Sequence, residues 1–132
     1  MKKKIRIIQY GVGPIGASIA KLLQEKESVE ICGAIDKDPS KIGRDLGEVI
    51  NAPDVPWGVE ISPNAKEVLE QGADVVMHTT SSSLPMVWNS LRACLEAESC
   101  VVSTCEELSY PFGRPERSKN KNTVGRAPWE TI

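Results

Sequence analysis

Three glycines spaced as Gly-x-Gly-x-x-Gly lie directly behind a short run of β-branched residues near the start of the chain. The run, residues 5–10, predicts a strand, and the apolar spacing over residues 14–26 predicts a helix. Gly11 permits a tight turn, Gly13 has no Cβ to block an approaching ligand, and Gly16 lets the helix pack close to the strand. This context predicts a βαβ unit that binds the pyrophosphate of a dinucleotide.

The helix that follows the glycines begins with features suited to an anion. Its first backbone amides have no partner within the helix and, together with the helix dipole, they face the ligand. Pro14 removes a donor only where the amide would be unsatisfied within the helix. The alternative is a glycine-rich turn without function. The residues predicted to bind the cofactor at this turn are Gly11, Val12, Gly13, Pro14, Ile15 and Gly16.

Strand-like and helix-like segments alternate as far as residue 104. Strands are predicted over residues 5–10, 29–35, 59–61, 74–78 and 100–104, and helices over 14–26, 41–49, 64–71 and 84–97. This alternation is typical of a parallel sheet with helices on both faces. We therefore predict an α/β fold with a Rossmann-type, doubly wound sheet, in a single dinucleotide-binding domain over residues 1–112.

Local signals place some of the helix ends. Ser62 is expected to be the N-cap of the helix over residues 64–71, with Pro63 at its first position. Gly72 is expected to end the same helix. The strands over residues 74–78 and 100–104 are nearly all apolar, so both are expected to be buried.

Asp36 lies at the end of the second predicted strand, twenty residues after Gly16. A carboxylate there can accept hydrogen bonds from both ribose hydroxyls of an adenosine, which favours NAD. Basic residues follow at Lys37, Lys41 and Arg44, and these cations could instead neutralise a 2′-phosphate and admit NADP. The cofactor is thus NAD or NADP, with Asp36 and Lys37 among its predicted contacts. Asp38 is expected to cap a turn at Pro39.

Small polar side chains follow the strand over residues 74–78, at the sheet edge where ligands bind in open α/β folds. Three of them are predicted to contact the ribose and diphosphate: Thr79, Thr80 and Ser81. Ser82 or Ser83 is expected to cap the next helix. His78 is the sole histidine, and a structural role is favoured over that of a base.

The segment after the last predicted strand reaches the same edge, near the place of a nicotinamide ring. Glu106 and Glu107 lie in it, and two adjacent carboxylates can attract an ammonium group. They are the candidate catalytic residues, and a solvated loop is the equal alternative.

Charge and cysteine content restrict the remaining classes. The net charge of −2 provides no field to attract nucleic acid or an anionic membrane. No run of 18 apolar residues could span a membrane, and no signal peptide is recognisable, which favours the cytoplasm. Cys32, Cys94, Cys100 and Cys105 form no metal-binding pattern and are expected to be buried, reduced thiols.

The last twenty residues differ in composition from the rest. Residues 113–132 hold five basic and two acidic residues, a net charge of +3, whereas residues 1–112 hold eleven and sixteen, a net charge of −5. Apolar residues are few there and follow neither the helical nor the strand period, which favours a disordered or aberrant tail.

Four segments together resemble one family: IRIIQYGVGPIG, GAIDKDPSKIGRDLGEVI, DVVMHTTSSS and VVSTCEELSYP. The chain is similar over residues 4–112 to the amino-terminal part of the dihydrodipicolinate-reductase-like oxidoreductases, in particular to members that deaminate a diamine. The resemblance implies a Rossmann domain, NAD or NADP, a small amine substrate and a homo-oligomer. Such proteins continue into a second domain, which this sequence lacks, so the chain alone is expected to be inactive.

Three functions compete at this stage. The first is the cofactor-binding domain of an amine dehydrogenase. The second is a non-enzymatic nucleotide-binding or redox-sensing module, whose basic tail would contact a partner. The third is a reductase of the same broad group that acts on an imine or a semialdehyde. No recognition element for a sensor is evident, which favours the first.

Overall fold

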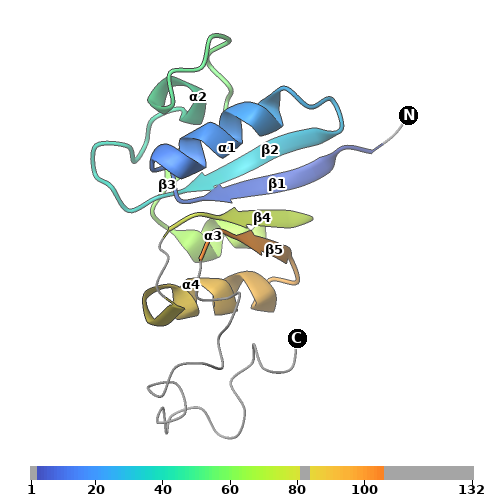
Figure 1. Cartoon of the computed structure of the whole chain (residues 1–132), viewed down its shortest axis with the longest axis vertical. Coiled ribbons are helices and arrows are strands. Elements are labelled where there is room, and N and C mark those ends of the chain that lie inside the picture. Colours follow the sequence, from blue (N-terminus) through green and yellow to red (C-terminus); the bar gives the residue numbers. More distant parts are fainter. Residues whose placement is uncertain (1–2, 81–83, 106–132) are drawn as a thin grey trace, which may run out of the picture.

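The computed structural model describes residues 3–80 and 84–105, which form one parallel sheet between two layers of helices (Figure 1). The sheet has the order β3-β2-β1-β4-β5, and every pairing is parallel. The strands are β1 (Ile5–Tyr10), β2 (Val29–Ile35), β3 (Ile61–Ser62), β4 (Val75–His78) and β5 (Cys100–Ser103). The predicted α/β, Rossmann-type fold is confirmed.

The helices are α1 (Pro14–Gln24), α2 (Leu46–Val49), α3 (Ala65–Glu70) and α4 (Leu84–Glu96). One core joins α1 and α2 to the sheet through Ala20, Ile31 and Leu46. A second core joins α3 and α4 to the sheet through residues such as Val68 and Cys94. The helices thus cover both faces, as a doubly wound sheet requires.

Several predicted boundaries need correction. The N-cap of α3 is Asn64 and not Ser62, because the Asn64 side chain accepts the hydrogen bond of the Glu67 amide. Ser62 instead ends β3, and its hydroxyl accepts a hydrogen bond from the Asn64 amide. Gly72 does follow this helix with a left-handed φ of 82°, as predicted.

The stretch between β2 and β3 holds less helix than predicted. Only residues 46–49 are helical, and the strand predicted over residues 59–61 is shifted to Ile61–Ser62. The Asp45 carboxylate organises this stretch by accepting hydrogen bonds from the backbone amides of Trp57, Val59 and Glu48. Although burial raises the pKa of Asp45, these amides outweigh it and hold that pKa below its usual range.

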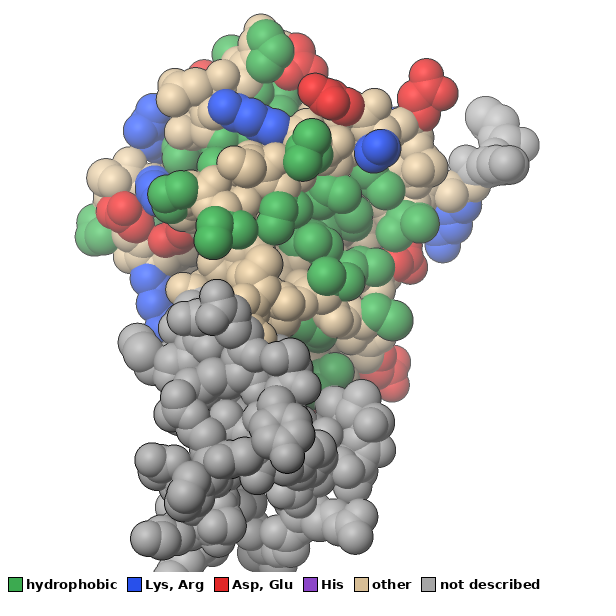
Figure 2. All heavy atoms as spheres, viewed as in Figure 1, with side chains coloured by type: hydrophobic (Ala, Val, Ile, Leu, Met, Phe, Trp, Pro, Cys, Tyr) green, Lys and Arg blue, Asp and Glu red, His purple; other side chains and the backbone are tan. Residues whose placement is uncertain are grey.

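Strand β5 is not buried, contrary to prediction, because it lies at the edge of the sheet within the described residues. Val102 is 53% exposed and Cys100 is exposed. Val102 pairs with Met77, whereas α1 packs chiefly against β1 and β2. Figure 2 shows hydrophobic side chains gathered on one face of the molecule, and Ile5 and Leu22 are further exposed hydrophobic residues.

Candidate functional site

The ends of β1, β2, β4 and β5 meet at one edge of the sheet. Tyr10 is in register with Ile35 on one side and with His78 on the other, and His78 is in register with Ser103. The chain order of the strands reverses between β1 and β4, and such reversal points open a crevice beyond the carboxyl ends of the strands.

A cleft of about 620 Å³ lies at this edge. Seven predicted cofactor contacts line it, namely Gly11, Val12, Gly13, Asp36, Lys37, Thr79 and Thr80. Of the other predictions, Pro14 and Ile15 are exposed beside the cleft and Gly16 is buried beneath the turn. Ser81, Ser82, Ser83, Glu106, Glu107 and the tail over residues 113–132 lie outside the described residues, so the predictions for them are untested.

The far wall of the cleft was not predicted from the sequence. It is formed by Tyr10, Ile35, Asn89, Ser90 and Ala93. Asn89 and Ala93 are four residues apart and therefore lie on one face of α4. That spacing is visible in the sequence, but only the packing of α4 against the sheet shows that this face borders the glycine turn.

The three glycines differ in what surrounds them. Gly11 has a φ of 100°, and a Cβ there would be 2.8 Å from the Thr79 carbonyl oxygen. A Cβ at Gly16 would overlap the Gly11 carbonyl oxygen and the Thr79 hydroxyl. A Cβ at Gly13 would meet no atom within 4 Å. The fold therefore requires Gly11 and Gly16, whereas the absence of a side chain at Gly13 leaves open space in the cleft.

Asp36 is tied to the glycine turn and to its own loop. Its Oδ2 accepts a hydrogen bond of 2.7 Å from the Val12 amide, and its Oδ1 accepts one of 2.8 Å from the Asp38 amide. A carboxylate oxygen can accept more than one hydrogen bond, so both oxygens keep capacity for ligand hydroxyls. The structure thus places Asp36 at the cleft without testing its predicted role.

The basic residues after β2 take different positions. Lys41 donates to the Val12 carbonyl oxygen at 2.7 Å and lies 3.8 Å from the Asp38 carboxylate. Lys37 is exposed and lines the cleft. The Asp38 carboxylate accepts hydrogen bonds from the Ser40 amide and hydroxyl, which confirms its turn role and lowers its pKa.

His78 is fully buried between β5 and α4. Its Nε2 lies 2.7 Å from the Ser90 hydroxyl, which also contacts the Val87 carbonyl oxygen, and 3.3 Å from the Thr80 hydroxyl. Its Nδ1 lies 3.1 Å from the Ser103 hydroxyl. Burial lowers the pKa of His78 from 6.5 to about 4, so the ring is neutral near pH 7. These contacts support the structural role.

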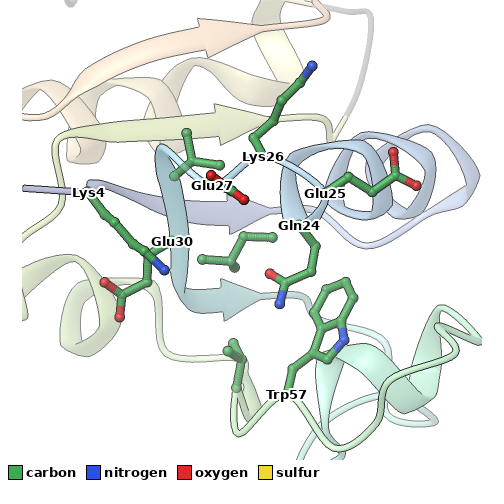
Figure 3. Close-up of a pocket in the computed structure, with 10 residues that line it drawn as sticks. Lys4, Gln24, Glu25, Lys26, Glu27, Glu30 and Trp57 are labelled. Atoms are coloured by element: carbon green, nitrogen blue, oxygen red, sulfur yellow. The ribbon is translucent and has the colours of Figure 1, made fainter. Parts of the chain in front are cut away.

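A second hollow of about 340 Å³ lies at the opposite ends of the strands (Figure 3). Trp57 and Gln24 border it together with charged side chains of both signs, including Lys4, Glu27 and Glu30. No predicted site residue lines it. The hollow lacks the glycine turn and the helix N-terminus that would bind phosphates, so the cleft at the glycine turn is the better candidate.

Other kinds of site find little support in the described part of the chain. There, no three His, Cys, Asp or Glu side chains are grouped as metal ligands would be. No helix there combines the length and the apolar character needed to cross a membrane. Cys94 and Cys105 are buried, but Cys100 is exposed and Cys32 half-buried, which corrects the expectation that all four cysteines are buried.

A parallel doubly wound sheet with a strand-glycine-helix turn at its crevice defines a dinucleotide-binding domain of the Rossmann type. Residues 5–105 match the model of the dihydrodipicolinate reductase N-terminus. The chain therefore belongs to the dihydrodipicolinate reductase family of NAD(P)-binding oxidoreductases, at the position of the N-terminal domain.

Individual relatives agree with this family. The chain is 29% identical over 126 residues to a 2,4-diaminopentanoate dehydrogenase of Acetoanaerobium sticklandii, covering 94% of this chain and 35% of that protein. It is 30% identical over 125 residues to a 4-hydroxy-tetrahydrodipicolinate reductase of Methanococcus aeolicus, covering 92% of this chain and 45% of that protein. The structure of an amine dehydrogenase from Mycobacterium smegmatis superposes with a TM-score of 0.80 at 36% identity, covering 86% of this chain and 33% of that protein. The chain thus spans between a third and a half of these proteins' lengths.

Proposed function

We propose that the chain binds NAD or NADP in the cleft at the glycine turn. The main observation behind this proposal is the difference in what surrounds the three glycines. Packing explains Gly11 and Gly16, whereas nothing in the described protein occupies the space beside Gly13. That space borders the start of α1, where backbone amides and the helix dipole favour a phosphate. A pyrophosphate is the ligand that fits both features.

The adenosine half would lie between the end of β2 and α4. Asp36 would accept hydrogen bonds from the ribose hydroxyls, and the half-buried Ala93, with the buried Ile35 behind the cleft, would form the apolar side that faces the flat base. The Asp36 charge repels a 2′-phosphate, which favours NAD, whereas Lys37 and Lys41 would attract one. Because Lys41 already contacts Val12 and Asp38, the balance favours NAD as the preferred or an equal cofactor.

We further propose that the domain serves an amine dehydrogenase. In such a reaction a hydride leaves the carbon that bears the amine and reduces NAD⁺, one proton is released, and the resulting imine is hydrolysed to a ketone and ammonia. The support is the likeness to the two amine-oxidising relatives at 29% and 36% identity. Glu106 and Glu107 remain the candidates to attract the ammonium group, in a cytoplasmic homo-oligomer whose substrate is a small amine.

The second candidate transfers the hydride in the opposite direction, in the reduction of an imine or a semialdehyde by NADH or NADPH. The likeness at 30% identity to 4-hydroxy-tetrahydrodipicolinate reductase favours it. Both candidates need the same cofactor site, so binding data alone do not separate them. Assaying a chain extended by the C-terminal part of each relative, with a diamine plus NAD⁺ or with 4-hydroxy-tetrahydrodipicolinate plus NADPH, does separate them.

Titration calorimetry with NAD, NADP and their reduced forms tests the cofactor proposal. Wild-type chain is expected to bind, and Gly13→Val is expected to lose binding because its side chain fills the pyrophosphate space. Leu22→Ala is the control, since Leu22 lies further along α1, is 61% exposed and does not line the cleft. Unchanged affinity in Gly13→Val would falsify the assignment.

A further inference from the structure

We infer that Gln9 is a positioning residue of the cofactor site, which fixes the orientation of the Gly11–Val12 peptide together with Thr79. The inference rests on the proposed function, because the site that it positions is the proposed dinucleotide cleft. Gln9 does not line that cleft, and its effect would pass through the backbone of the glycine turn.

The side chain of Gln9 reaches the turn from beneath. Gln9 is fully buried on β1, and its Nε2 donates to the Gly11 carbonyl oxygen at 3.0 Å and to the Thr79 hydroxyl at 3.1 Å. The Thr79 hydroxyl in turn donates to the same Gly11 oxygen at 2.8 Å. A carbonyl oxygen only accepts hydrogen bonds, so the amide group that faces it must be the NH₂.

The other end of the same peptide unit is also held. Its N–H, which belongs to Val12, donates to Asp36 Oδ2 at 2.7 Å. The carbonyl oxygen of this peptide therefore accepts from Gln9 on β1 and from Thr79 after β4. Its N–H donates to Asp36 after β2. A peptide held at both ends cannot rotate without breaking these bonds, so the turn leading to Gly13 is fixed before any ligand arrives.

The stability of the fold does not explain why a glutamine occupies this position. The Thr79 hydroxyl already satisfies the Gly11 oxygen, and Gln9 Oε1 is buried without a hydrogen-bond partner among the described residues. A buried acceptor without a partner destabilises a fold, whereas an apolar side chain of the same size would not. Such exceptions to the rules of stable packing are expected at functional sites, where orientation matters more than stability.

Gln9→Met tests the inference, because methionine fills a similar volume without polar atoms. The dissociation constant for NAD, measured where every variant is folded, is expected to rise about fivefold to tenfold. The thermal midpoint is expected to stay unchanged or to rise, because the orphaned oxygen is removed. An unchanged dissociation constant would overturn the inference, whatever the midpoint.

Two comparisons make the test specific. Ile8→Val, next to Gln9 but on the other sheet face, is expected to lower the thermal midpoint and to leave NAD affinity unchanged. Thr79→Val is expected to weaken NAD binding, and Thr79→Ser, which keeps the hydroxyl, is expected to restore it. Equal affinities in the valine and serine variants would count against the shared role of Gln9 and Thr79.

Amide hydrogen exchange separates this inference from the proposed function. In ligand-free protein, the Val12 amide is expected to exchange faster in Gln9→Met than in wild type, because the carbonyl end of the peptide then keeps only the hydrogen bond from Thr79. If wild type binds no dinucleotide, the proposed function fails while the exchange result still decides whether Gln9 holds the peptide. Equal exchange of the Val12 amide in both proteins would overturn the inference.

Discussion

Asp36 and Val12 are joined by a 2.7 Å hydrogen bond from the Val12 amide to Asp36 Oδ2. The bond links the end of β2 to the glycine turn behind β1, at the point where the adenosine and the pyrophosphate of a dinucleotide would meet. Asp36 therefore has two expected tasks, to hold the turn and to accept ribose hydroxyls.

Asp36→Ser is expected to move cofactor preference toward NADP, because it removes a negative charge from the place of the 2′-phosphate. The ratio of the NADP to the NAD dissociation constant should fall about tenfold, a change of about 1.4 kcal/mol. Titrations of wild type and variant with both cofactors measure it, and Ser40→Ala on the neighbouring loop is the control. If wild type prefers NADP tenfold or more, the attraction of a 2′-phosphate by Lys37 and Lys41 outweighs its repulsion by Asp36.

Gly16→Ala is expected to destabilise the fold by about 1–3 kcal/mol, because the added methyl group overlaps the Gly11 carbonyl oxygen. Gly13→Ala is the matched control, with an unfolding free energy close to that of wild type, since nothing in the described structure lies near its Cβ. Urea unfolding compares the two. Equal stabilities would contradict the close helix-strand packing at Gly16.

The buried His78 predicts a loss of stability on mild acidification. Its pKa is about 4 in the folded chain and 6.5 when exposed, so the unfolded state binds the proton first. This contribution is complete above pH 6.5 and is lost as the pH falls toward 4, amounting to about 3 kcal/mol. Urea unfolding at several pH values measures the slope. The unfolding free energy of His78→Asn should depend less on pH between 6.5 and 4. An equally steep dependence would contradict the lowered pKa of His78.

The thiols are expected to react in an order set by exposure. Cys100 is exposed, whereas Cys94 is fully buried and burial raises its pKa to about 11. Because the thiolate is the reactive form, iodoacetamide should label Cys100 first and Cys94 only after unfolding. Mass spectrometry of digested samples measures the order, with labelling in denaturant as the control for all four thiols. Early labelling of Cys94 would show that α4 does not bury Cys94 against the sheet as described.

The 132-residue chain by itself is expected to bind a dinucleotide without oxidising 2,4-diaminopentanoate. Hydride transfer requires the substrate carbon to be held about 3–3.5 Å from the nicotinamide, and the described cleft has walls from one sheet edge and α4 only. NADH formation at alkaline pH measures activity, with a chain extended by the C-terminal part of a relative as the positive control. Clear turnover by the chain alone would show that its own residues complete the site.

The sequence by itself determined the features that depend on neighbouring residues. The run before Gly11, the glycine spacing and the apolar period of α1 indicated a βαβ unit because each is a local property of the backbone. The place of Asp36 at the end of β2 followed in the same way. Helix ends were predicted less well, since Ser62 and Asn64 both suit an N-cap and only the local geometry selects between them.

Only the tertiary structure decided which distant residues meet. No local feature of the sequence distinguishes Gln9, and its link to Gly11 and Thr79 exists because β4 pairs with β1. Asn89 reaches the cleft because α4 packs beside the sheet edge, and β5 is exposed because it lies at the border of the described sheet. Strand order and helix placement bring together residues that lie far apart in the sequence, and no local pattern records that pairing.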